Sequence, residues 1–178
     1  MSASPLDLNV SNNAEIKGLP DFLVHQLKDI LWTEKFLRRQ MSEIRSYVTS
    51  ARLRMGIENH MKEIDKQIWR LEEVFLVINE PVQMQPNVGL KALVQDAMKT
   101  IKATKLGSMV RDVCIINCLQ KVEHYEIASY GTLKTLAIVL GHPQAADLLE
   151  QTLNEEKNAD AIFSTIAEVF INEQAAGE

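Results

Sequence analysis

Apolar residues recur every three or four positions along four long stretches of this 178-residue chain. The stretches extend from Asp21 to Val48 and over residues 52–79, 108–140 and 144–173. This spacing places the apolar side chains on one face of an α-helix, and we find no segment with the pattern of a strand. The pattern therefore predicts an all-α protein in which four long helices form a four-helix bundle.

Turn-forming residues and a further amphipathic segment lie between these helices. Residues 79–87 contain two prolines and are expected to form a loop. Residues 89–104 are again amphipathic, which predicts one additional short helix beside the bundle. Gly141 and Pro143 are typical of a helix end followed by a helix start.

Each of the long helices carries at least one carboxylate in or beside its apolar stripe. Glu34 stands in the first stripe and Glu156 in the fourth, Glu63 lies at the border of the second, and Glu123 and Glu126 share one face of the third helix. A buried, ionised carboxylate loses its hydration at a cost of several kcal/mol. It must therefore be protonated, paired with a basic group or bound to a cation, and the pattern leaves these alternatives open.

A pair of divalent metal ions would neutralise several converging carboxylates at once. Oxygen-rich ligation favours iron or manganese as the two ions. The candidate ligands are Glu34, Glu63, Glu123, Glu126 and Glu156. Residues that would support them or add further ligands are His60, Gln67, Tyr130 and Asp160. Lys66 and Lys157 are the candidates for neutralising Glu63 and Glu156 instead, and Glu155 is expected to be solvated.

Composition limits the setting in which such a site would work. The net charge of -5 and the mixed distribution of acids and bases argue against a nucleic-acid partner. We find no apolar run of about 18 residues, so no membrane span is expected. The two cysteines and the absence of a recognisable signal peptide favour a reducing, cytoplasmic setting. We expect a flexible N-terminal arm over residues 1–19 and one bundle domain over residues 20–174.

Four segments of the chain, "LKDILWTEKFL", "IENHMKEIDKQIWRLEEVF", "KVEHYEIASYGTLKTLA" and "TLNEEKNADAIF", carry a family resemblance. In this order they resemble the four helices of the YciE/YciF family of ferritin-like proteins. The resemblance covers about residues 20–170 and implies a rubrerythrin-like fold, a homodimer and a role in bacterial stress responses. Carried over by position, it implies functional residues at Glu34, His60, Glu63, Gln67, Glu123, Glu126, Glu155, Glu156 and Asp160.

The chain also departs from that family's pattern. Ile64 replaces a threonine, and Gln67 is the amide alternative to a histidine. Lys66 and Ala159 stand three residues after Glu63 and Glu156, where a rubrerythrin-like site has histidines. These departures place the occupancy of a metal site in question.

Two functions follow from these observations. In the first, the protein binds two iron or manganese ions and reacts with oxygen or peroxide. In the second, it is a non-catalytic structural or stress dimer with a degenerate or vacant metal site. Metal content distinguishes the two, and the sequence does not decide whether the protein is an enzyme. A helical adaptor for another protein ranks last, because we find no large apolar face beyond what a dimer would bury.

Overall fold

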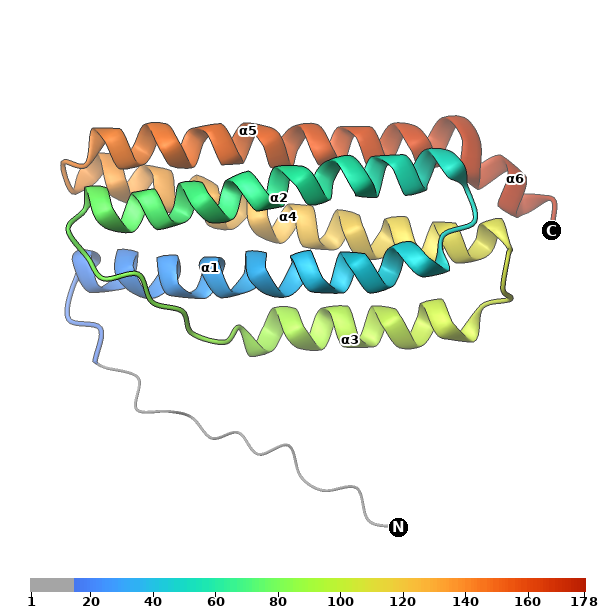
Figure 1. Cartoon of the computed structure of the whole chain (residues 1–178), viewed down its shortest axis with the longest axis horizontal. Helices are drawn as coiled ribbons and strands as arrows, with labels where there is room; N and C mark the ends of the chain where they lie inside the picture. Colours follow the sequence, from blue (N-terminus) through green and yellow to red (C-terminus); the bar gives the residue numbers. More distant parts are fainter. Residues whose placement is uncertain (1–14) are drawn as a thin grey trace, which may run out of the picture.

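The computed structural model describes residues 15–178. It contains four long helices, α1 (Leu19–Ile44), α2 (Ala51–Val77), α4 (Met109–Val139) and α5 (Pro143–Ile166) (Figure 1). Shorter elements are η1 (Arg45–Tyr47), α3 (Val88–Ala103), the π-helical turn η2 (Ala167–Ile171) and α6 (Asn172–Ala176). The described part of the chain has no strand, so the predicted all-α bundle is confirmed. Most of the arm expected over residues 1–19 lies outside the described residues.

Local sequence signals fix where several helices begin. The side chains of Ser50, Asn87 and Ser108 each accept a hydrogen bond from a backbone N–H in the first turn of α2, α3 and α4. Gly141 has a φ of 79°, a left-handed conformation that favours glycine, and Pro143 opens α5. Two details differ from the sequence prediction. The first helix ends at Ile44 rather than near Val48, and a π-helical turn interrupts the last helix after Ile166.

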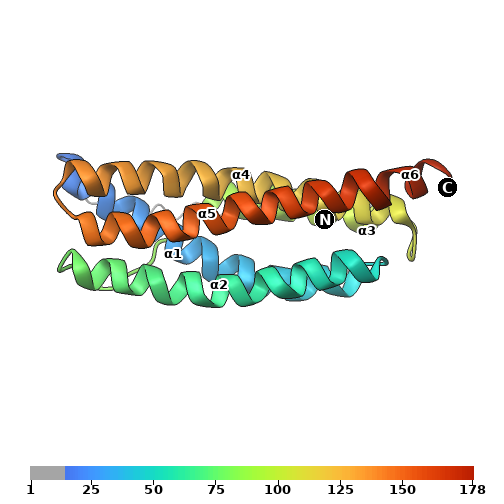
Figure 2. The same cartoon turned by 90° about the horizontal axis from the view of Figure 1, so that it is seen from above.

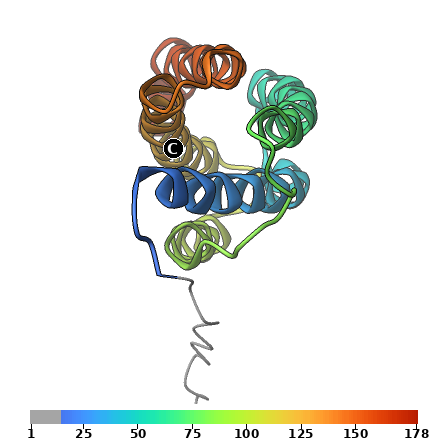
Figure 3. The same ribbon diagram turned by 90° about the vertical axis from the view of Figure 1, so that its left-hand side faces the viewer.

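The four long helices form a ring in which α1 contacts α2 and α4, and α5 contacts α4 and α2. The end view in Figure 3 shows this ring with α3 outside it, and α3 packs against α4. The most extensive contact joins α4 and α5, which run side by side in Figure 2. None of the described helices is both long and apolar enough to cross a membrane.

The core consists of two separate apolar clusters, one toward each end of the bundle. The first includes Phe36 and Leu37 of α1 and Val122 of α4. The second includes Ile30 and Leu31 of α1. Each long helix contributes to both clusters, and Glu34, Glu123, Glu126 and Glu156 lie on the stretches between them.

One buried carboxylate outside that region has a structural explanation. Asp112, near the start of α4, accepts backbone hydrogen bonds from Thr49 N (2.9 Å) and Ser50 N (2.6 Å). Its side chain is fully buried. It therefore fixes the turn between α1 and α2 against α4.

We predict that Asp112→Ala lowers the free energy of unfolding by about 1 to 3 kcal/mol, because two backbone donors lose their acceptor. Urea denaturation followed by circular dichroism measures the change. Asp65→Ala is the control, because it removes an exposed ion pair with Arg38 and should cost no more than about 1 kcal/mol. Equal losses in the two variants would show that Asp112 does not anchor the turn.

Candidate metal centre

A layer of buried polar side chains separates the two apolar clusters. Glu34, Glu123 and Glu156 have no exposed surface, and Glu126 is 1% exposed. These four carboxylates come from α1, α4 and α5. Helix α2 contributes buried polar groups to the bundle interior through His60 and, two turns further along, Gln67.

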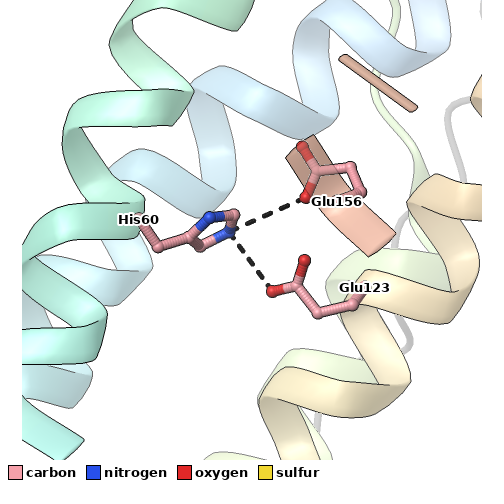
Figure 4. A group of neighbouring side chains, drawn as sticks. All are labelled: His60, Glu123 and Glu156. Atoms are coloured by element: carbon pink, nitrogen blue, oxygen red, sulfur yellow. Dashed lines mark ion pairs between the residues drawn. The ribbon is translucent and has the colours of Figure 1, made fainter. Parts of the chain in front are cut away.

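His60, Glu123 and Glu156 form the tightest group in this layer (Figure 4). His60 Nε2 lies 3.2 Å from Glu123 Oε1 and 3.9 Å from Glu156 Oε2. One ligand atom from each residue lies within 4.8 Å of the other two. Three helices thus aim a nitrogen and two carboxylates at one point.

Glu34 and Glu126 extend the layer on the side of α1. The hydroxyl group of Tyr130 donates a hydrogen bond to Glu34 Oε1. The side chains of Glu34, Glu126 and Tyr130 are all buried. Tyr130 therefore contacts one of the acidic residues, while its part in a metal site stays a prediction. Glu126 is close enough to Glu34, Glu156 and Glu123 for their charges to raise its pKa.

Many polar atoms in this layer find no hydrogen-bond partner among residues 15–178. They include both oxygens of Glu123 and Glu156, His60 Nε2, and one oxygen each of Glu34 and Glu126. Buried polar groups are almost always satisfied in folded proteins. This concentration of unpartnered acceptors in one place therefore indicates protons or a cation that binds there.

Burial dominates the acid–base behaviour of the carboxylates. It raises the pKa of Glu34 to about 7, against the opposing effects of the Tyr130 hydrogen bond and the positive charge of His60. Burial also raises the pKa values of Glu126 and Glu156 well above their ordinary range, and neighbouring carboxylates add to the shift. Without a cation, these groups therefore hold protons at pH values where ordinary carboxyl groups are ionised.

The pKa of His60 is also raised, but here burial opposes the shift and the neighbouring acids cause it. Burial alone would lower its pKa, but the negative charge of the adjacent Glu123 and the hydrogen bond to Glu63 raise it well above the usual value. Glu63 in turn has a lowered pKa, chiefly because of its hydrogen bond with His60. A protonated His60 is therefore the nearest positive charge available to the buried acids in the absence of metal.

The donor set fits a divalent transition metal. Carboxylate oxygen and imidazole nitrogen bind such ions at about 2.0 to 2.2 Å, so neighbouring ligand atoms of one ion lie about 3 Å apart and opposite ones about 4 Å apart. The contacts from His60 to Glu123 and Glu156 fall in this range. His60 would hold the ion through Nε2 while its Nδ1 contacts Glu63 Oε2 at 3.5 Å, an arrangement that orients metal-binding histidines elsewhere.

The other predicted site residues lie around this group. Glu63 is half-buried and contacts His60 from the side away from Glu123. Gln67 is fully buried, with Nε2 donating to Glu155 and Oε1 unpartnered. Asp160 lies 3.3 Å from the exposed His124 on the α4 side. Whether any of these residues binds metal stays a prediction.

Charge pairing around the site differs from the sequence prediction. Glu155 is only partly exposed rather than solvated, because Arg70 Nη1 and Nη2 donate to its two carboxylate oxygens over 2.8 and 2.9 Å. Lys157 forms no ion pair with Glu156 within the described chain, and Lys66 makes the smallest contribution to the lowered pKa of Glu63. Sequence reasoning missed Arg70. Its position immediately before Leu71, a residue of the second apolar stripe, was the sequence feature that could have indicated its burial.

These features define a helical-bundle protein with a buried carboxylate–histidine group. The family model described as "Domain of unknown function (DUF892)" matches residues 18–176. The chain is 36% identical to Protein YciF of Escherichia coli K12 over 161 residues, which is 90% of this chain and 96% of that protein. The chain belongs to this family, and the resemblance to the YciE/YciF proteins is confirmed.

Solved structures support the same relationship. The stress protein YciF of E. coli is 34% identical with a TM-score of 0.83, over 89% of this chain and 99% of that one. A protein from Rhodopseudomonas palustris, described as YcfI, a putative structural protein, is 33% identical with a TM-score of 0.83, over 87% and 98%. A protein from Xanthomonas campestris pv. campestris is 22% identical with a TM-score of 0.70, over 90% and 98%, and shows the fold alone.

The raised pKa of Glu34 predicts how the stability of the metal-free protein depends on pH. Because the folded value of about 7 exceeds the ordinary value of 4.5, Glu34 favours the folded state fully below about 4.5. This contribution declines as pH rises and is lost once the pH passes about 7. Thermal unfolding of chelator-treated protein from pH 5 to 8 should therefore show a falling Tm.

Glu34→Gln is the matched variant, since it keeps the size and polarity of the side chain and cannot titrate. Its Tm should change less than that of the wild type over the same pH interval. A wild-type Tm that rises toward pH 8, or an identical slope in the variant, would contradict the assignment of Glu34 as a protonated buried acid.

Proposed function

We propose that this protein binds two iron or manganese ions among the buried carboxylates and protects the cell under oxidative stress by reaction with oxygen or peroxide. The observation that carries the proposal is the group of four buried carboxylates, six of whose oxygens have no hydrogen-bond partner in the described chain, beside His60 Nε2. Protonation would neutralise the carboxylates. A divalent ion would neutralise them as well, and it would also bind their free oxygens and His60 Nε2 as ligands.

The residues divide into two candidate positions. His60, Glu123 and Glu156 would hold one ion, and Glu34 and Glu126 would supply the remaining oxygen ligands for the other. A redox-active ion bound there would supply the electrons for a reaction with oxygen or peroxide. The chain would orient Glu34 through the hydroxyl group of Tyr130 and His60 through Glu63. The two apolar clusters would limit the access of water from both ends.

The cellular setting is part of the same proposal. The relative from E. coli is described as a stress protein, which supports a stress role for this chain. Cys114 and Cys118 are free, as a reducing cytoplasm would keep them. We keep the homodimer as the expected assembly, without a nucleic-acid or membrane partner.

A second function has its own support. Lys66 and Ala159 occupy the positions where histidines would complete a rubrerythrin-like site, and the solved relative from R. palustris is described as a putative structural protein. With Glu34, Glu126 and Glu156 protonated, the bundle could close without metal. In that case the protein would be a non-catalytic structural dimer with a vacant site.

Metal analysis separates these functions. We predict about two iron or manganese ions per chain in untagged protein purified without chelator and loaded anaerobically, as measured by inductively coupled plasma mass spectrometry. Glu123→Gln with Glu156→Gln should abolish binding at the position beside His60. Glu34→Ala with Glu126→Ala should remove the other ion, because each pair supplies the oxygen ligands of its position.

Glu58→Gln with Glu72→Gln is the control, since both acids form ion pairs at the surface. It should bind as much metal as the wild type. Wild-type protein that stays free of iron and manganese after loading would contradict metal binding and favour the structural dimer.

A further inference from the structure

Arg70 and Glu155 form a clamp between α2 and α5 to which the proposed metal chemistry assigns no role. Arg70 is only 9% exposed, and its guanidinium group binds both oxygens of Glu155. Arg70 Nη1 also donates to Thr152 Oγ1 over 2.6 Å, and Gln67 Nε2 donates to Glu155 over 3.2 Å. Two residues of α2 thus bind two residues of α5, and we call these four residues the seam clamp.

The seam clamp is directly connected to the carboxylate layer. Glu155 immediately precedes Glu156, so any movement of α5 that frees one carboxylate also shifts the other. Gln67 lies two helical turns after His60 on the inner side of α2 and is fully buried. Its Oε1 has no partner among residues 15–178, which leaves a polar acceptor in the bundle interior between the clamp and the site.

The seam between α2 and α5 also carries acidic groups that reach the solvent. Glu63 is half-buried and contacts His60, while the side chain of Glu155 retains 29% of its exposure. Glu63 contacts His60 directly, and Glu155 precedes Glu156 in the sequence. Both acids therefore lie next to the group formed by His60, Glu123 and Glu156. A cation that enters from solvent between α2 and α5 would therefore meet these two carboxylates before it reaches His60, Glu123 and Glu156.

The neighbouring seams are less suitable as a route. Helices α4 and α5 have the most extensive contact in the bundle. The α1–α2 seam is bridged by two ion pairs, Lys35 with Glu72 and Arg38 with Asp65, and neither of these acids contacts His60, Glu123 or Glu156 in the described chain. Figure 3 shows α2 and α5 facing each other on the side of the ring opposite α1 and α4.

We propose that the α2–α5 seam is the entry route for the divalent cation and that the seam clamp closes it. Bidentate pairing between guanidinium and carboxylate is strong and strongly directional, so the closed state is well defined. Opening separates Arg70 from Glu155 and leaves a carboxylate free to attract the incoming ion. This inference rests on the proposed metal binding, and it assigns Arg70 a role in exchange rather than in ligation.

Two variants break the clamp in different ways. Arg70→Met keeps the length of the side chain without its donors, and Glu155→Gln keeps the size of the acceptor without its charge. Arg70→Met should speed Mn²⁺ loading and Mn²⁺ release to a chelator by about tenfold, which corresponds to about 1.4 kcal/mol in the opening equilibrium. Because both of its rates rise together, its Kd for Mn²⁺ should change less than about threefold. Glu155→Gln should speed release by a similar factor but loading by less, because it also removes the carboxylate that attracts the ion.

Arg70→Lys tests the geometry, since it keeps the charge and loses the bidentate pairing; its rates should fall between those of the wild type and Arg70→Met. Lys134→Met is the matched control, because it removes another ion pair of α5, with Glu150. Its rates should equal those of the wild type. Unchanged rates in both clamp variants would overturn the proposal, and so would a weakened Kd with an unchanged loading rate.

Metal-free protein provides a second readout that distinguishes failure of the route from failure of metal binding. Amide hydrogen exchange should accelerate in Arg70→Met over residues 60–70 and 152–159 relative to Lys134→Met, while residues 88–103 of α3 remain unchanged. Selective acceleration supports the opening motion even if the wild type binds no Mn²⁺. Acceleration spread evenly over all helices would show only lost stability and would overturn the clamp as a closing device.

Discussion

The structure depends on the burial of four carboxylates in the middle of a helical bundle. Glu34, Glu123 and Glu156 have no exposed surface, and Glu126 has almost none. Each ionised group would lose several kcal/mol of hydration and would repel the others. Among residues 15–178, the other polar groups that contact them directly are His60 and the hydroxyl group of Tyr130. Protons or cations must therefore complete the charge balance of this layer.

The rest of the fold isolates that layer. One apolar cluster lies on each side of it along the bundle axis, so most of the hydrophobic stabilisation comes from the two ends. Asp112 and the capping residues fix the helix ends, and the clamp of Arg70 with Glu155 fixes α2 against α5 beside the site. The two clusters and the contacts at the helix ends therefore stabilise the fold without apolar side chains at the positions of the four carboxylates.

Periodicity predicted the helices because the apolar stripes are long and regular, and it placed Glu34, Glu123 and Glu126 inside because they interrupt those stripes. It could not predict side-chain direction at a stripe border. His60 and Glu63 lie three residues apart on α2, yet His60 is buried while Glu63 reaches solvent. It also could not predict that Glu155 pairs with Arg70, since the two residues are 85 positions apart and their contact depends on how the helices pack.

The most direct test of this account is anomalous X-ray diffraction from crystals of the protein loaded with Mn²⁺. The account predicts an anomalous peak about 2 Å from His60 Nε2 and from carboxylate oxygens of Glu123 and Glu156, with a second peak beside Glu34 and Glu126. The contradicting result is a buried layer without anomalous density in which the carboxyl groups hydrogen-bond to one another as protonated acids.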